Sequence, residues 1–91
     1  MSKIDTMRSR LAALAPSVLD IRDDSHQHLG HAGFRDDGSH FSMSIVSSQF
    51  EGKSPIARHR MVYAALGEMM KEDIHAMNID AKTPAEAQRS A

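Results

Sequence analysis

The strictest pattern in this 91-residue sequence is an alternation of apolar and polar residues between His40 and Val46. Phe41, Met43 and Ile45 take every second position, and serines lie between them. Because successive side chains of a β-strand point to opposite faces, the alternation predicts a strand with one buried face. The other face of that strand is expected to lie in water.

Two further segments favour strands. Residues 18–23 are rich in branched side chains, with Leu19 and Ile21 on one face and charged residues on the other. Residues 74–81 give a third candidate strand. The connection 26–38 between the first two strands, about thirteen residues, exceeds ordinary hairpin length, and loops of that length are usually functional or mobile.

The N-terminal segment has the spacing of a helix. Ser2 and Asp5 have the spacing of a capping box, and Pro16 is expected to end the helix because proline disfavours a helical residue before it. Apolar residues three and four positions apart would line its buried face: Ile4, Met7, Leu11 and Leu14.

A second helix is predicted after Ser54, which can cap it, with Pro55 at the first helical position. Gly67 would weaken its interior by ~1 kcal/mol, which indicates close packing or a local break. The same start signal recurs at 83–86 and predicts a short helix over 84–90. The apolar stripe of the long helix would be Ile56, Val62, Leu66, Met69 and Met70.

Length and composition predict one small globular domain over 1–91, with a core of about 2–82. No apolar run approaches the roughly 20 residues that cross a bilayer, and 1–10 lacks the apolar segment of a signal peptide. We therefore expect a cytoplasmic protein without a membrane partner. The net charge of -1 disfavours binding to nucleic acid that is driven mainly by electrostatic attraction.

Three short patterns invite a catalytic or phosphate-binding interpretation and are discounted. Residues 47–54 end like a phosphate-binding loop, but Ser47 stands where that motif needs glycine. The GxxG pattern at 30–33 lies between two strands instead of two helices. Ser39 and His40 suggest a nucleophile beside a base, but adjacent residues on the expected strand would point to opposite faces. We therefore expect no enzyme.

Six histidines and no cysteine limit the metal chemistry open to the chain. Imidazole suits zinc, copper, iron and nickel. His26, His28 and His31 share one loop, but without a fourth ligand they do not make a closed zinc site. His75, alone at the start of the third strand, is by itself more typical of a structural residue.

A small basic patch is the other candidate site. Lys53, Arg58, His59 and Arg60 cluster around the start of the long helix. Charged residues on a helix usually solvate its surface. Alternatively, the patch could receive an acidic partner surface or a phosphate backbone.

The motifs at 50–55 and 58–63, together with 39–41 and 74–76, resemble the BolA family over about 11–84. The resemblance implies an α+β, type II KH-like fold with a three-stranded mixed sheet, in the order helix, strand, strand, helix, turn, helix, strand, helix. It also implies a helix-turn-helix, so a short extra helix near Phe50 should precede the long one.

The resemblance also implies a function. Members of the family pair with monothiol glutaredoxins and share a 2Fe-2S cluster with them, so His75 would be one ligand and a loop histidine the other. His31 and His28 are nearly equal candidates, and His26 is third. The partner's cysteine and a bound glutathione would supply the rest, so the chain would be a monomer alone and a heterodimer with glutaredoxin.

A second function implied by the family is transcriptional regulation. DNA would then bind the helix-turn-helix face through Lys53, Arg58 and Arg60, with His59 in the same patch, and binding would not depend on His75.

Overall fold

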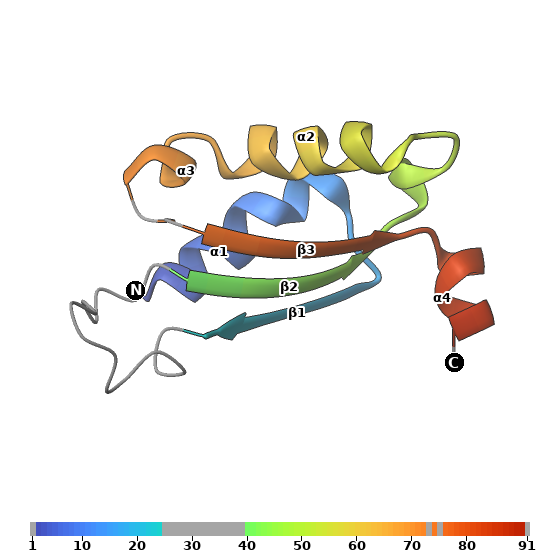
Figure 1. Ribbon diagram of the computed structural model, residues 1–91, viewed down its shortest axis with the longest axis horizontal. Coiled ribbons are helices and arrows are strands. Elements are labelled where there is room, and N and C mark those ends of the chain that lie inside the picture. Colours follow the sequence, from blue (N-terminus) through green and yellow to red (C-terminus); the bar gives the residue numbers. More distant parts are fainter. Residues whose placement is uncertain (1, 25–39, 73, 75, 91) are drawn as a thin grey trace.

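The computed structural model describes residues 2–24, 40–72, 74 and 76–90, which form an α+β fold around a three-stranded mixed sheet (Figure 1). The sheet order is β1-β2-β3, with β1 antiparallel and β3 parallel to β2. The strands are β1 (Val18–Asp23), β2 (His40–Val46) and β3 (Ala76–Lys82). The α-helices are α1 (Lys3–Leu11), α2 (Pro55–Leu66), α3 (Met69–Glu72) and α4 (Pro84–Ser90), and the 3-10 helices are η1 (Ala12–Leu14) and η3 (Ser48–Phe50).

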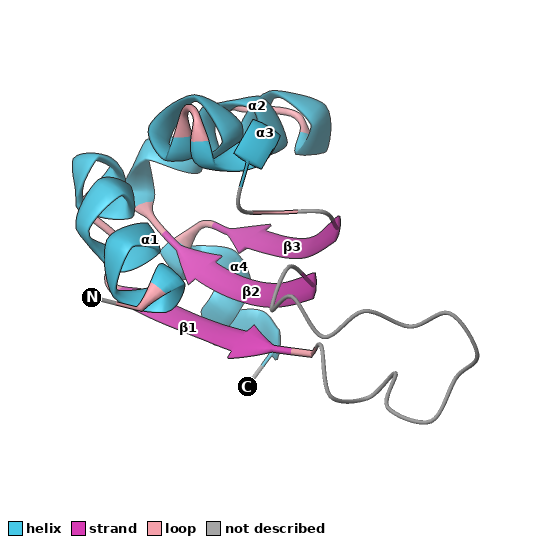
Figure 2. Ribbon diagram, turned by 90° about the vertical axis from the view of Figure 1, so that its left-hand side faces the viewer, coloured by secondary structure: helices cyan, strands magenta, loops and turns pink. Residues whose placement is uncertain are grey.

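Helices α1, α2 and α3 cover one face of the sheet (Figures 1 and 2). A parallel pair of strands needs a long crossover connection, and η3, α2 and α3 provide it between β2 and β3. The core lies between this helical layer and the sheet. Its buried members are Met7, Leu11, Leu14, Ile21, Phe41, Met43, Ile45, Phe50, Val62, Leu66, Met69 and Ile74.

The first helix confirms the predicted capping box but ends earlier than expected. The Asp5 backbone N–H donates to Ser2 Oγ (3.1 Å), and the Ser2 N–H donates to the Asp5 carboxylate (3.4 Å). The α-helix ends at Leu11 and tightens into η1, and Ala15 adopts a φ of +48° before Pro16. Leu14, the last residue of the 3-10 helix, is buried, so the predicted apolar face continues from α1 into η1.

The predicted start of α2 is confirmed, since Ser54 Oγ accepts from the Ala57 N–H (3.1 Å) and Pro55 opens the helix. Of the two alternatives for Gly67, the local break is confirmed. Gly67, with φ +58°, ends α2, and α3 follows as a separate helix.

One residue of the predicted stripe lies off it. Ile56 is 65% exposed, whereas Val62, Leu66 and Met69 are buried. Ile56 and Val62 are six positions apart, and each residue of an α-helix turns the chain by about 100°. The two side chains are therefore about 120° apart around the helix, which places Ile56 away from the sheet.

The third strand runs over Ala76–Lys82 instead of 74–81. The capping box of α4 is confirmed, because the Thr83 N–H donates to Glu86 Oε1 (2.9 Å) and the Glu86 N–H donates to Thr83 Oγ1 (3.2 Å). The short helix expected near Phe50 is present as η3. Within the described segments, no helix has the length and apolar character required to span a bilayer.

Candidate functional site

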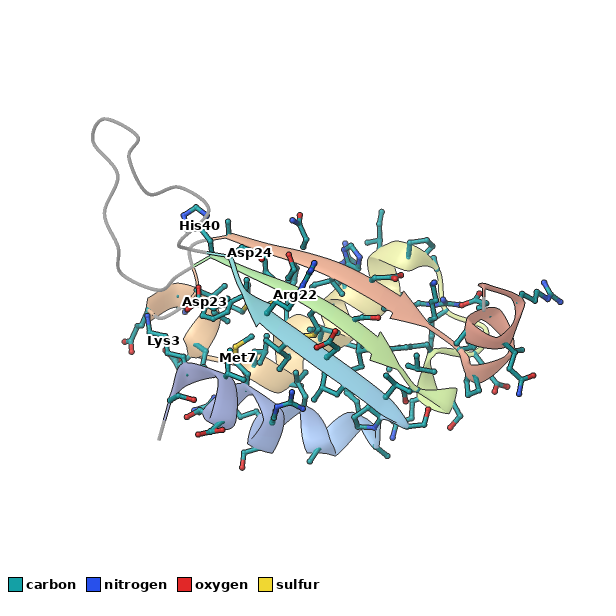
Figure 3. The ribbon with its side chains drawn as sticks, turned by 90° about the horizontal axis from the view of Figure 1, so that it is seen from below. Lys3, Met7, Arg22, Asp23, Asp24 and His40 are labelled. Carbon is teal, nitrogen blue, oxygen red and sulfur yellow. The ribbon has the colours of Figure 1, made fainter. Side chains whose placement is uncertain are left out.

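The connection between β1 and β2 leaves and rejoins the sheet at the end where β3 begins. The Asp24 N–H donates to the His40 carbonyl at 2.8 Å, which closes the base of that connection. His40 is in turn opposite Ala76 in the parallel register of β2 and β3. Figure 3 shows Asp24 and His40 side by side at this end of the sheet. The chain segments that flank the predicted histidine ligands therefore meet at one end of the sheet.

The predicted ligands themselves, His28, His31 and His75, lie outside the described residues, as does His26. Their role as ligands stays a prediction. Across 2–24, 40–72, 74 and 76–90, no group of three or more histidine or carboxylate side chains could hold a metal ion.

The chain is anchored immediately before β3. The Ile74 N–H donates to the Met69 carbonyl at 2.9 Å, and the Ile74 side chain is 6% exposed. This contact ties the entry into β3 to α3, so the core holds the backbone on the N-terminal side of position 75.

A polar contact that sequence reasoning missed lies beside this end of the sheet. The Ser42 hydroxyl donates to the Asp24 carboxylate. The antiparallel register explains the contact, because Ser42 is the diagonal neighbour of Asp24 across the strand pair. The register of two strands could not be known from the sequence of either one.

In the basic patch, Arg58 points into the fold. Its side chain is 12% exposed. Its Nη1 and Nη2 donate to the two Glu86 carboxylate oxygens (2.6 and 3.2 Å), and Nη1 also donates to the Ala81 carbonyl (3.1 Å). Nε donates to the Lys53 carbonyl (3.0 Å). Arg58 thus joins the start of α2 to the end of β3 and to α4 through a two-pronged, charge-assisted pair.

This pair fixes the charge of both partners. The Arg58 guanidinium, helped by the Thr83 N–H, lowers the pKa of Glu86 from 4.5 to about 2. The hydrogen bond to Glu86 in turn raises the pKa of Arg58. Both groups are therefore charged throughout the neutral range, and the guanidinium of Arg58 is already engaged within the fold.

The remaining patch residues lie on the surface of α2 and its entry. Lys53 and Arg60 are exposed, and His59 is half-buried. The His59 ring lies 6.4 Å from that of Tyr63, which is 40% exposed, in a tilted arrangement. The structure thus separates Arg58 from the other three residues, whose binding role stays a prediction.

Comparison with known proteins identifies the class to which this fold belongs. A family model described as BolA-like protein matches residues 11–86. The chain belongs to the BolA-like family.

Several named relatives share this domain. The chain is 49% identical over 78 residues to the chloroplastic/mitochondrial SufE-like protein 1 of Arabidopsis thaliana, covering 80% of this chain and 21% of the relative. It is 43% identical over 90 residues to the chloroplastic protein BOLA1 of the same plant, covering 94% and 56%. BolA-like protein 1 of Mus musculus is 47% identical over 74 residues, covering 81% and 52%. The chain therefore spans about half or less of these relatives.

Solved structures share the fold. The chain resembles BolA1 from Arabidopsis thaliana with a TM-score of 0.82 and 43% identity, covering 94% of this chain and 96% of the other. It resembles the BolA domain of SufE1 from the same plant with a TM-score of 0.81 and 40% identity, again covering 94% and 96%.

Proposed function

We propose that the protein acts in iron–sulfur assembly or trafficking by sharing a 2Fe-2S cluster with a monothiol glutaredoxin, in a non-catalytic role. Membership of the BolA-like family and the similarity to a SufE-like protein support an iron–sulfur role. The observation that carries the proposal is the meeting of the β1–β2 connection and the start of β3 at one end of the sheet.

The donor set explains why a partner is required. A 2Fe-2S cluster has four ligand positions, usually filled by thiolates, and the chain contains no cysteine. Two histidines can serve one iron, as in Rieske centres. In the proposal His75 and either His31 or His28 fill those two positions. The partner's cysteine and a bound glutathione fill the other two, so the isolated chain is a monomer without a cluster.

Anaerobic reconstitution with a monothiol glutaredoxin, iron, sulfide and glutathione tests the proposal. The complex should show the visible absorption of a 2Fe-2S cluster, and His75→Ala should abolish it. Of His31→Ala and His28→Ala, one should have the same effect. His59→Ala removes an imidazole on α2 and is the matched control. A cluster spectrum that survives His75→Ala would overturn this assignment.

A second candidate function is nucleic-acid binding by a KH-like, helix-turn-helix module. It is favoured by the succession of η3, a turn and α2, with Lys53 and Arg60 exposed at the start of the long helix. Because Arg58 is engaged with Glu86, the clean test is Lys53→Ala combined with Arg60→Ala. Loss of a salt-sensitive gel shift in that variant, with His75→Ala still binding DNA, would favour this function over cluster sharing.

A further inference from the structure

The sheet face opposite the helices carries a polar trough of about 380 Å³. Arg22, one of the residues that line it, is labelled in Figure 3. Its floor is formed on the central strand, where Ser42 and Ser44 are half-buried. Exposed side chains of β1 and β3 form its two walls. The polar residues that line it are Asp20, Arg22, Ser42, Ser44, Asn78 and Asp80.

The strand register sorts these side chains into two rows of opposite character. In one row Ser44 lies opposite both Asp20 and Asp80, so a hydroxyl is flanked by two carboxylates. This row suits a cationic group.

In the other row Ser42 lies opposite both Arg22 and Asn78. A guanidinium and an amide there provide hydrogen-bond donors that suit a carboxylate. Among the lining residues, the trough therefore has two carboxylates at one end and one cation, Arg22, at the other, where the Asp24 carboxylate lies beside Ser42.

The groups of the trough are only partly engaged by the fold. Within the described segments, the Arg22 guanidinium makes no hydrogen bond or ion pair. Asp80 lies 3.6 Å from the Lys82 ammonium, with 57% of the aspartate side chain exposed, and such surface pairs are weak. The Ser42 hydroxyl already donates to the Asp24 carboxylate, so Arg22 and Asn78 alone would hold a ligand carboxylate in this row. A ligand would thus compete with few internal contacts.

We propose that this trough binds a zwitterionic ligand of dipeptide size, with its ammonium at the Asp20 and Asp80 row and its carboxylate at the Arg22 and Asn78 row. The two rows are two residues apart along each strand, which is about 6.6 Å. Two extended residues span about 7 Å at most, so the termini of a dipeptide match this spacing. A single amino acid is too short to reach both rows.

Titration of the ¹⁵N-labelled full chain with glycylglycine, followed by amide chemical shifts, tests the proposal. We expect saturable shifts centred on residues 20, 22, 42, 44, 78 and 80. Glycine, N-acetylglycylglycine and glycylglycinamide each lack the spacing or one charge, and each should bind roughly tenfold more weakly or worse.

Variants separate the proposed contacts from an unspecific effect. Arg22→Gln should weaken glycylglycine binding by about tenfold, and Arg22→Lys should retain part of it. Lys71→Gln removes one positive charge from α3, on the helical side, and should leave binding unchanged. Dispersed amide spectra show that each variant is folded.

Two outcomes would overturn the proposal. One is the absence of trough shifts with glycylglycine. The other is binding of glycylglycinamide as tight as that of glycylglycine, which would show that the trough binds cations and does not recognise the carboxylate.

Discussion

Single polar side chains hold distant parts of this fold together. Ser47 is completely buried, and its hydroxyl donates to the Leu14 carbonyl (2.6 Å) while accepting from the Gln49 N–H (3.1 Å). Arg58 and Glu86 perform a similar function between α2 and α4. The Ser47 contacts satisfy buried groups that would otherwise be left without a partner as water is excluded.

Replacement of Ser47 tests the first contact. Ser47→Ala should lower the free energy of unfolding by about 1–3 kcal/mol, since it leaves the buried Leu14 carbonyl without its hydroxyl donor. Ser48→Ala, at the exposed neighbouring position, is the matched control and should have little effect. Urea denaturation at neutral pH measures both, and equal stability of the two variants would contradict the expected role of Ser47.

The Arg58–Glu86 pair predicts a dependence of stability on acid. The pKa of Glu86 is lowered from 4.5 to about 2 in the fold. The carboxylate therefore contributes stability that is fully present above about pH 4.5 and is lost as the pH falls towards about 2. Glu86→Gln should remove this part of the acid dependence, whereas Glu68→Gln, in the turn before α3, should keep it.

Urea midpoints measured across that pH window check the prediction. Parallel acid profiles for the parent chain and Glu86→Gln would show that the pair does not set the stability there.

At the scale of elements, helix ends and sheet edges are defined by contacts between elements. Arg10 Nη1 donates to the Leu66 carbonyl (2.9 Å) at the end of α2. Arg8 Nη1 donates to the Leu19 carbonyl (3.1 Å) on β1, and Arg58 Nη1 donates to the Ala81 carbonyl (3.1 Å) on β3. The register points these two strand carbonyls away from β2, so an arginine covers part of each sheet edge. Covered edges discourage pairing with other chains.

The end of α2 depends on Gly67. Its φ of +58° is unfavourable for a residue with a side chain, and an added Cβ would lie 3.1 Å from Arg10 Nη1. Gly67→Ala should therefore cost of order 1–3 kcal/mol in unfolding free energy, with α2 and α3 disturbed. Gly52→Ala is matched for positive φ but has open space around its Cβ, so it should cost less. Thermal unfolding compares them, and the reverse order would refute this explanation.

The whole molecule depends on a small core. A chain of this length is expected to have a free energy of unfolding of about 5–14 kcal/mol. Phe50 is fully buried and is the largest side chain of that kind in the described part of the chain. It comes from η3, at the start of the crossover, and belongs to the core cluster between the helices and the sheet.

Truncation of this ring should be costly. Phe50→Ala is expected to lower the free energy of unfolding by about 3–5 kcal/mol, through lost burial and the cavity left behind. Ile56→Ala removes an apolar side chain that is 65% exposed and should change stability by less than about 0.5 kcal/mol. Denaturant titration distinguishes the two, and a small effect of Phe50→Ala would show that the core relaxes around the cavity.

The sequence by itself determined the local features of this protein. The strands over 18–23 and 40–46, the capping boxes at Ser2 and Thr83 and the cap at Ser54 were all predicted, because periodicity and capping depend on residues a few positions apart. The family was also evident from local motifs, and the comparisons confirm it.

Only the tertiary structure decided which distant groups meet. Arg58 and Glu86 are 28 positions apart, and the rows of the trough exist only once three strands are in register. Likewise, the exposure of Ile56 depends on which side of α2 the sheet covers. The candidate ligands His28, His31 and His75 stay predictions. The physical reason is that long-range pairing is set by the packing of whole faces, which no local pattern encodes.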